Sequence, residues 1–261
     1  MAEGPWAADF SFAYYRRLLT AVRQHWTPHL FRDAGEALAR GERAFFLRHD
    51  VDVSLERALH IAAAEHEIGF ATTYMVMNRG LLYSLHWSGS HRILKQISAM
   101  GHEIGVHLEH PDPYHPTEKL PVEILERRIR AASVELEDVL GAPVASFAVH
   151  RPTPAAMRGP LMLGGRVNAS AAELMHRYLS DSKGSWREGE PLAVIAGATD
   201  VPVLQVLVHP IWWGEHHLPA LERLSEFRTE RVAGLDGEAR RRFDADLAAT
   251  LPGVVLPPHA A

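Results

Sequence analysis

The sequence predicts an α/β protein folded as a distorted (β/α) barrel of mostly parallel strands. Three observations lead to this prediction. Short apolar or β-branched segments alternate with longer segments of helical period. No internal repeat or linker-like stretch divides the 261 residues, so we expect one domain over 1–261, with a core over about 44–213 and helical extensions at both ends. Polar residues that could carry chemistry follow the predicted strands, where barrel proteins place their sites.

The predicted elements follow in chain order. Residues 9–26 are amphipathic and predict a helix, and residues 44–50 (AFFLRHD) are short and apolar and predict a buried strand. Ser54 suits the N-cap of a helix that stops at Gly69. Residues 155–175 are ambiguous and predict helix pieces broken at 164–165. The other expected strands are 70–77, 103–107, 144–149, 177–181 and 203–209, and the other expected helices are 86–100, 121–140 and 217–251, the last broken at 234–237.

The composition of the chain excludes several classes of function and of metal site. With 27 Lys+Arg against 32 Asp+Glu, the net charge of −5 provides no basic field for nucleic acid or an anionic membrane. The chain has no Cys, which excludes disulfides, thiolate metal ligands and Cys nucleophiles, so a bound metal must use carboxylates and some of the 17 His. The start of the chain shows no secretory signal and no apolar run could cross a bilayer, so we expect a cytoplasmic protein. No feature predicts the oligomeric state.

The first polar cluster ends the strand 44–50. Strand alternation puts Arg48, Asp50 and Asp52 on one face, and His49 and Val51 on the other. Two carboxylates on one face repel each other unless a cation or a proton separates their roles. The competing interpretation is a pair of loop acids, one of which caps the next helix.

Polar residues also end four further predicted strands. His107 closes the segment GHEIGVH, His150 follows the strand 144–149, Asp181 ends the strand 177–181, and His209 ends the strand 203–209. A single histidine of this kind is more often an ordinary surface or core residue. Five polar clusters at the ends of five strands predict instead that these side chains meet in one site.

Taken in order, these motifs resemble the polysaccharide deacetylase family, carbohydrate esterase family 4, over about residues 45–213. The resemblance rests on HDVD at 49–52, GHEIGVH at 101–107, HRP at 150–152, and the polar runs at 178–187 and 207–214. It implies a distorted (β/α) barrel that hydrolyses an N-acetyl or O-acetyl group. It also implies a divalent metal, usually zinc, held by one Asp and two His; Co²⁺, Ni²⁺ or Mn²⁺ would suit the same ligands.

The resemblance implies Asp52 and His107 as metal ligands and leaves the third ligand open. The usual H-x-x-x-H spacing would place it four residues after His107, where this chain has Pro111. His110 is one candidate. The other is His150, which follows a separate strand and can converge with His107 without distorting the chain. We favour His150.

The catalytic roles follow from the same resemblance. Asp50 is implied as the base that takes a proton from metal-activated water, with Arg151 as the arginine that contacts it. His209 is implied as the acid that protonates the departing amine, oriented by Asp181. Aromatic residues that could stack on a sugar complete the implied set: Trp186, Trp212 and Trp213. The competing interpretation of the last two is a hydrophobic plug over the barrel mouth.

The expected function is therefore a metal-dependent deacetylase that acts on a small acylated amine, an amino sugar or its conjugate. Hydrolysis of a non-sugar amide or imide would use the same site. The competing hypothesis is a non-catalytic binding protein on the same barrel that has lost the metal, since one ligand position has changed. The chain has a suitable residue for each of the other implied ligand and catalytic roles, which argues against this second hypothesis.

Overall fold

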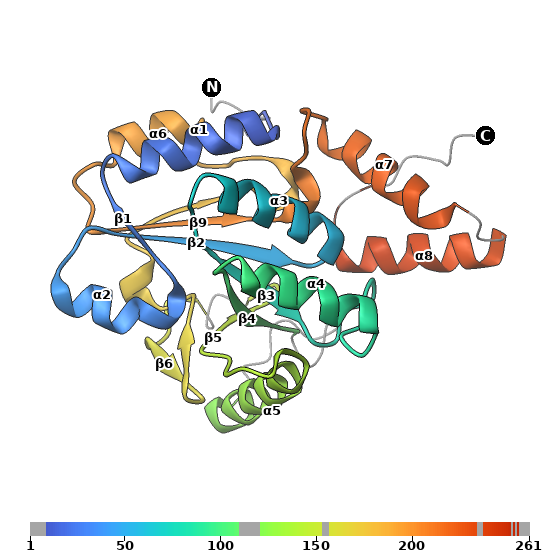
Figure 1. Cartoon of the computed structure of the whole chain (residues 1–261), viewed down its shortest axis with the longest axis horizontal. Helices are drawn as coiled ribbons and strands as arrows, with labels where there is room; N and C mark the ends of the chain where they lie inside the picture. The colour runs from blue at the N-terminus through green and yellow to red at the C-terminus, as the bar shows by residue number, and fades with distance from the viewer. Residues whose placement is uncertain are drawn as a thin grey trace.

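A curled sheet of mostly parallel strands forms the centre of the computed structural model, which describes residues 9–109, 121–152, 157–233, 237–251, 253 and 255. Within these residues the strand order is β6-β7-β5-β4-β3-β2-β9-β8, and β1 pairs with β2 off this path. All pairs are parallel except β6 with β7. The sheet curls into a half-barrel (Figure 1), which confirms the predicted α/β fold of barrel type.

The element bounds agree with most of the predicted ranges. The strands are β1 Thr27–His29, β2 Ala44–Val51, β3 Thr73–Met77, β4 Glu103–Leu108, β5 Ser146–Val149, β6 Met162–Leu163, β7 Arg166–Asn168, β8 Arg177–Ser180 and β9 Val203–Val208. The α-helices are α1 Phe12–Arg23, α2 Ala34–Arg40, α3 Leu55–Glu67, α4 Ser88–Ala99, α5 Val122–Leu140, α6 Pro191–Gly197, α7 Ala220–Val232 and α8 Gly237–Thr250. The Ser54 side chain accepts a hydrogen bond from the Arg57 amide, as expected of an N-cap.

One predicted segment is wrong. Residues 162–168 form the antiparallel hairpin β6–β7 and not pieces of helix. Gly164 and Gly165 have φ of 58° and 75°, which is the backbone of a tight hairpin turn that favours glycine at both central positions. The pair of glycines therefore reverses the chain and does not interrupt a helix. The short elements β1, α2 and α6 were also missed, since each is too short for a periodic pattern to show.

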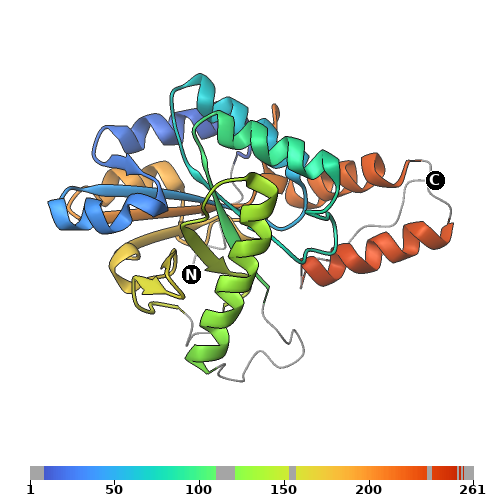
Figure 2. The same cartoon turned by 60° about the horizontal axis from the view of Figure 1, so that its bottom comes forward.

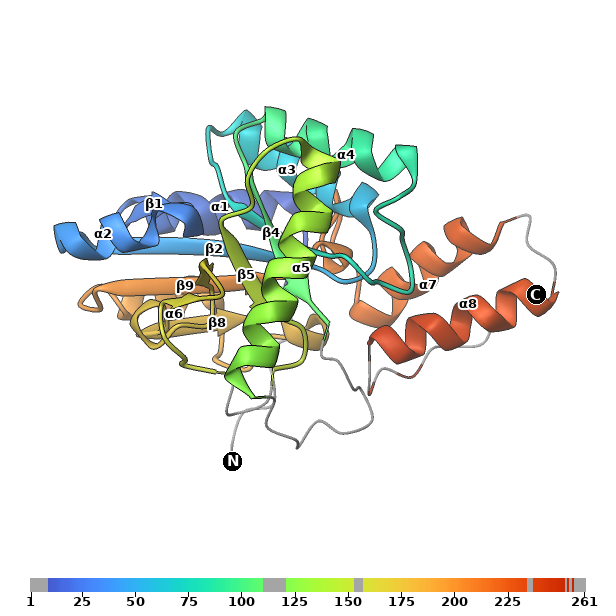
Figure 3. The ribbon, with the colours of Figure 1, turned by 90° about the horizontal axis from the view of Figure 1, so that it is seen from below.

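The helices cover the sheet but leave a cavity at the C-terminal end of the strands. Helix α5 packs on β4 (Figure 2), and α1, α3 and α4 bury the main apolar core against the sheet. Helices α7 and α8 project beyond the C-terminal end of β2 (Figure 3). Thr250 and Leu251, at the end of α8, line a cavity at that same end. None of the helices in the described ranges combines the length and apolar character needed to span a bilayer.

A buried polar cluster joins the outer face of β2 to the helices. His49 Nε2 lies 2.8 Å from Glu65 Oε1, and the hydroxyls of Tyr74 and Thr72 donate to Glu65 Oε2 at 2.6 and 2.8 Å. Tyr15 donates a further hydrogen bond to Glu65. Burial alone would raise the pKa of Glu65, but the charge of His49 and these hydrogen bonds lower it below 4.5. An ionised carboxylate thus satisfies several buried donors at once.

Replacing Glu65 by Gln is expected to lower the free energy of unfolding at neutral pH by about 1–3 kcal/mol, because an amide leaves a buried donor of this cluster unsatisfied. The folded-state pKa of Glu65 lies below its unfolded value, so its contribution is present above pH 4.5 and is lost as the pH falls through the folded pKa. The difference between wild type and variant should therefore shrink in acid. Urea unfolding of wild type and variant, at neutral pH and again in acid, measures this difference in the free energy of unfolding. Glu67→Gln is the control, since Glu67 is exposed on the same helix, and equal losses in the two variants would contradict the prediction.

Candidate active site

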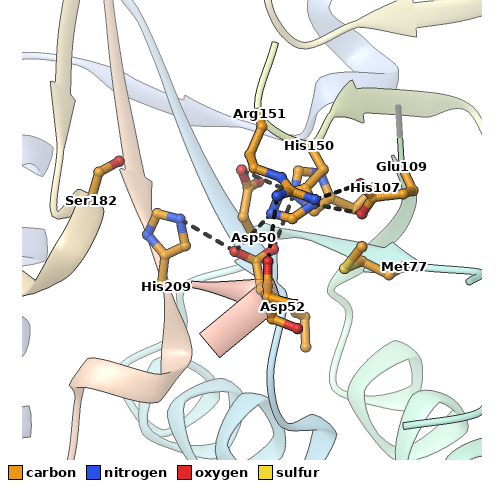
Figure 4. A network of polar contacts seen from close by, with 12 residues as sticks. Asp50, Asp52, Met77, His107, Glu109, His150, Arg151, Ser182 and His209 are labelled. Carbon is orange, nitrogen blue, oxygen red and sulfur yellow. Dashed lines mark hydrogen bonds and ion pairs between the residues drawn. The ribbon is translucent and has the colours of Figure 1, made fainter. Parts of the chain in front are cut away.

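The C-terminal ends of β2, β4, β5, β8 and β9 bring the predicted site residues together. Parallel strands end at the same edge of a sheet, so side chains that are far apart in sequence converge there. A cavity of about 240 Å³ opens at this edge and is lined by Asp50, Asp52, His150, Arg151 and His209, among others. Figure 4 shows these side chains pointing toward one another. The side chains that follow these strand ends therefore lie close together in the structure.

Strand alternation in β2 separates two sets of side chains. Arg48 and Asp50 face the cavity, where Arg48 Nε lies 2.9 Å from Asp50 Oδ1 and Arg48 Nη2 lies 3.2 Å from Asp50 Oδ2. His49 points to the opposite face, toward α3. Both members of the Arg48–Asp50 pair are about 95% buried, with side-chain exposures of 5% and 6%. Arg48 supplies the counter-charge that a carboxylate in this position requires.

Asp52, His107 and His150 form a cluster that could bind a metal ion. Each offers one ligand atom, and these atoms lie within 4.8 Å of one another. His107 Nε2 is 3.1 Å from Asp52 Oδ1, and His150 Nε2 is 3.7 Å from Asp52 Oδ2. Burial would raise the pKa of Asp52, but contact with His107 and the charges of the surrounding histidines lower it well below its usual range. The carboxylate is therefore ionised, as a metal ligand must be.

The unsatisfied atoms of this cluster fit a divalent cation. Both ring nitrogens of His107 and Oδ1 of Asp52 are buried. His107 Nε2 and Asp52 Oδ1 contact each other at 3.1 Å, but none of these atoms makes a hydrogen bond of normal geometry with the described residues. Buried polar atoms are normally paired, because an unpaired one costs free energy. One carboxylate oxygen with two imidazole nitrogens is a ligand set that zinc and its neighbours accept, with positions left open for water or substrate.

Glu109 orients the third member of the cluster. Its Oε2 lies 2.7 Å from His150 Nδ1, and its Oε1 accepts a hydrogen bond from Arg151 Nη2 at 2.8 Å. Burial would lower the pKa of His150, but the hydrogen bond to Glu109 and the charge of Asp52 raise it. Because a carboxylate accepts the Nδ1 proton, Nε2 is the nitrogen that faces Asp52, and a carboxylate that holds a histidine in this way is typical of metal sites. His110, the alternative ligand, lies outside the described residues.

Asp181 and His209 form a second pair on the other side of the site. Asp181 Oδ1 lies 2.7 Å from His209 Nδ1, and both carboxylate oxygens accept from the His209 backbone N–H at 3.0 Å. Burial would lower the pKa of His209, but the hydrogen bond and the charge of Asp181 raise it to about 9. His209 Nε2 is directed toward Asp52, 3.8 Å from Oδ2 (Figure 4). The raised pKa favours a protonated imidazole at neutral pH, and this imidazole lies beside the candidate metal cluster.

Comparison with known proteins gives structural neighbours only. No protein-family model and no curated protein matches the chain. A family 4 pseudoenzyme from Bacillus anthracis is 15% identical (TM-score 0.39), with 79% of this chain and 59% of that chain covered. IcaB from Ammonifex degensii is 17% identical (TM-score 0.43), with coverages of 78% and 86%. A family 4 acetyl xylan esterase from Clostridium thermocellum, solved with cobalt, is 14% identical (TM-score 0.39), with coverages of 72% and 84%.

The chain resembles the polysaccharide deacetylases of carbohydrate esterase family 4. At these identities and TM-scores the neighbours support no statement about activity. The chain also spans less than two thirds of the pseudoenzyme that it matches, 59% of that protein's length. The activity of this chain therefore has to be argued from its own residues.

The arginine beside the predicted base differs from the expected one. Arg151 was expected to contact Asp50, but its ion pair is with Glu109, and Arg48 occupies the place beside Asp50. The reason is local, because Arg48 precedes Asp50 by two residues on the same face of β2, whereas Arg151 follows β5, three strands away in the sheet order. Strand alternation places Arg48 on the same face as Asp50, so this signal is present in the sequence. Glu109 was also missed, although it follows His107 by two residues.

The three tryptophans are buried, and Trp186 and Trp213 do not line the cavity, which argues against their stacking on a sugar. Trp186 is 0% exposed, and Trp212 and Trp213 are each 1% exposed. Trp213 donates from Nε1 to Asp181 Oδ2 at 2.9 Å, and its ring packs on Tyr15 and Trp186. Of the three, Trp212 borders the cavity. Indole rings are large enough to fill the space behind the strand ends, and Trp213 supports Asp181 from the core side.

Proposed function

We propose that this protein is a metal-dependent deacetylase that removes an N-acyl group from an amino-sugar-type substrate. The observation behind the proposal is the joint placement, at one sheet edge, of the Asp52/His107/His150 cluster and the Asp181–His209 pair, with Asp50 beside the cluster. Hydrolysis of an amide by activated water needs a base for the water and an acid for the departing amine. The cavity provides one candidate for each.

The residues divide the proton transfers between two sides of the cavity. Asp50 Oδ2 lies 3.5 Å from His107 Nε2, so this carboxylate borders the ligand cluster and accepts the proton of the attacking water. Arg48 holds Asp50 in place. On the other side, His209 carries a proton on Nε2 and donates it to the leaving nitrogen, while Asp181 holds the Nδ1 proton and fixes the ring. The amine then leaves neutral, which an amide substrate requires.

Asp52, His107 and His150 would hold the divalent ion. When bound, such an ion supplies Lewis acidity that lowers the pKa of water and polarises an acyl carbonyl. Zinc is our first choice of metal, and Co²⁺, Ni²⁺ or Mn²⁺ would fit the same donors. The Asp52 carboxylate is already ionised, and His150 presents Nε2 with its other nitrogen held by Glu109. Arg151 borders the cavity and steadies Glu109.

The test is acetate release from N-acetylglucosamine and its oligomers by purified protein, with and without a chelator. We expect release that stops with chelator and returns when zinc is added back. No bound metal and no release would favour a non-catalytic binding protein on the same fold. Metal binding with release from simple amides but not from sugars would place the substrate outside carbohydrates.

Replacing His150 by Ala is expected to abolish stable metal binding, while His110→Ala keeps it. The reason is that His150 Nε2 converges with Asp52 and His107, and loss of one of three protein ligands leaves two. Metal content after dialysis, measured by mass spectrometry, checks this. His209→Ala is the matched control, because it removes a neighbouring imidazole outside the cluster and should keep the metal. Metal lost in His110→Ala and kept in His150→Ala would exchange the two assignments.

A further inference from the structure

Two cations at the rim of the cavity have no role in the mechanism above. Lys183 and Arg187 follow β8, the strand that pairs with β9, and both line the cavity. Both are exposed, and among the described residues neither has an ion-pair or hydrogen-bond partner for its side chain. They are thus free to bind a group of the substrate that lies outside the acyl centre.

The backbone at Lys183 is an independent sign of a functional position. Lys183 has φ 62° and ψ 25°, the left-handed region that a residue with a Cβ adopts less readily than glycine. In the described ranges, positive φ outside glycine occurs at Arg151, Arg158 and Lys183. Two of these three, Arg151 and Lys183, line the cavity. Unfavourable backbone of this kind concentrates at ligand sites, where the position of a side chain matters more than local stability.

The acidic side chains that line the cavity have other positively charged neighbours, so none of them balances the charge of Lys183 and Arg187. Two acidic side chains line it: Asp50 pairs with Arg48, and Asp52 lies among three histidines. A divalent cation at Asp52 would add further positive charge. The acids in the cavity are therefore already balanced, and the rim at Lys183 and Arg187 faces the substrate with net positive charge.

We propose that the substrate of this site carries an anionic group, a phosphate or a carboxylate, which Lys183 and Arg187 bind outside the reacting amide. The inference rests on the proposed deacetylase function and specifies its substrate class. Arginine and lysine are the side chains that recognise such oxyanions by charge-assisted hydrogen bonds. Apolar side chains, including Met157, Met175 and Leu251, line other parts of the cavity and offer no competing charge.

The test compares three probes of the same sugar: N-acetylglucosamine, its 1-phosphate, and the corresponding 6-carboxylate. We expect wild type to show a KM about tenfold lower for an anionic probe than for the neutral one. The double variant Lys183→Gln/Arg187→Gln should raise that KM about tenfold. Its kcat and its KM for the neutral sugar should stay unchanged. The phosphate and carboxylate arms show which oxyanion the rim prefers.

Arg158→Gln is the matched control, because Arg158 is an exposed arginine with the same left-handed backbone that does not line the cavity. Equal KM for all three probes, or an equal rise for neutral and anionic probes in the double variant, would overturn the inference and leave the deacetylase proposal intact. If wild type releases acetate from none of the probes, calorimetric binding decides the inference separately. Weaker binding of an anionic probe to the double variant than to Arg158→Gln supports it, and equal or undetectable binding overturns it.

Discussion

Replacing Asp50 by Asn is expected to lower kcat for amide hydrolysis by a factor of about 10²–10⁴ while the protein keeps its metal. An asparagine is close in shape to the carboxylate but cannot accept the proton of the attacking water. Asp50 borders the ligand cluster and does not belong to it, since Asp52, His107 and His150 are the residues whose ligand atoms converge.

The matched variant is Asp52→Asn, two residues further along the chain. It should lose both metal and activity, because Asp52 is the one carboxylate of the cluster and lies 3.1 Å from His107 and 3.7 Å from His150. Metal content and acetate release, measured on the same preparations, separate the two roles. Metal lost from Asp50→Asn and kept in Asp52→Asn would mean that base and ligand are exchanged. Thermal unfolding is needed beside both measurements, because Asp50→Asn leaves Arg48 buried without its counter-charge.

Replacing His209 by Ala is expected to reduce hydrolysis of an N-acetyl amide by about 10²–10⁴, and hydrolysis of an activated aryl acetate by much less. The departing nitrogen of an amide must receive a proton, whereas a nitrophenolate leaves without one. The ratio of the two rates therefore reports on the acid directly. A variant that lost both activities equally would show that His209 acts on binding or folding and not as the acid.

The pH profile tests the same assignment. The pKa of His209 is raised to about 9, so the imidazole stays protonated at neutral pH and loses its proton as the pH rises through that value. Amide hydrolysis should fall on the alkaline side accordingly, and a cation bound at Asp52 would move the fall to lower pH by repelling the proton. Asp181→Asn removes the partner that raises this pKa, so its alkaline fall should begin at lower pH than in wild type. An unchanged profile in Asp181→Asn would argue against the pair.

The strand 44–50 and its alternation can be predicted from the sequence, because a buried strand with a two-residue period carries its own signal. The hairpin at 162–168 is not predictable in this way, because two glycines and very short strands provide no period. Pairing of β7 with β5 selects the strand conformation there. Length limits what a local pattern can show.

The candidate site also has one part that the sequence predicts and one part that it does not. The sequence is enough to infer that five side chains meet, because a parallel sheet brings the carboxyl ends of its strands to one edge. These are Asp50, His107, His150, Asp181 and His209. The sequence is not enough to infer which neighbours each of them contacts. Arg48 and not Arg151 pairs with Asp50, and Glu109 holds His150, as a result of strand order and curl.

The sequence by itself therefore determined the class of fold, the residues at the strand ends, and the absence of thiolate ligands. The tertiary structure alone decided the pairings: it turned Trp213 inward to support Asp181, and it left Lys183 and Arg187 without partners in the described residues at the rim. The physical reason is one of range. Periodicity and capping act over a few neighbouring residues, whereas a hydrogen bond or ion pair requires atoms from distant segments to come within about 3–4 Å.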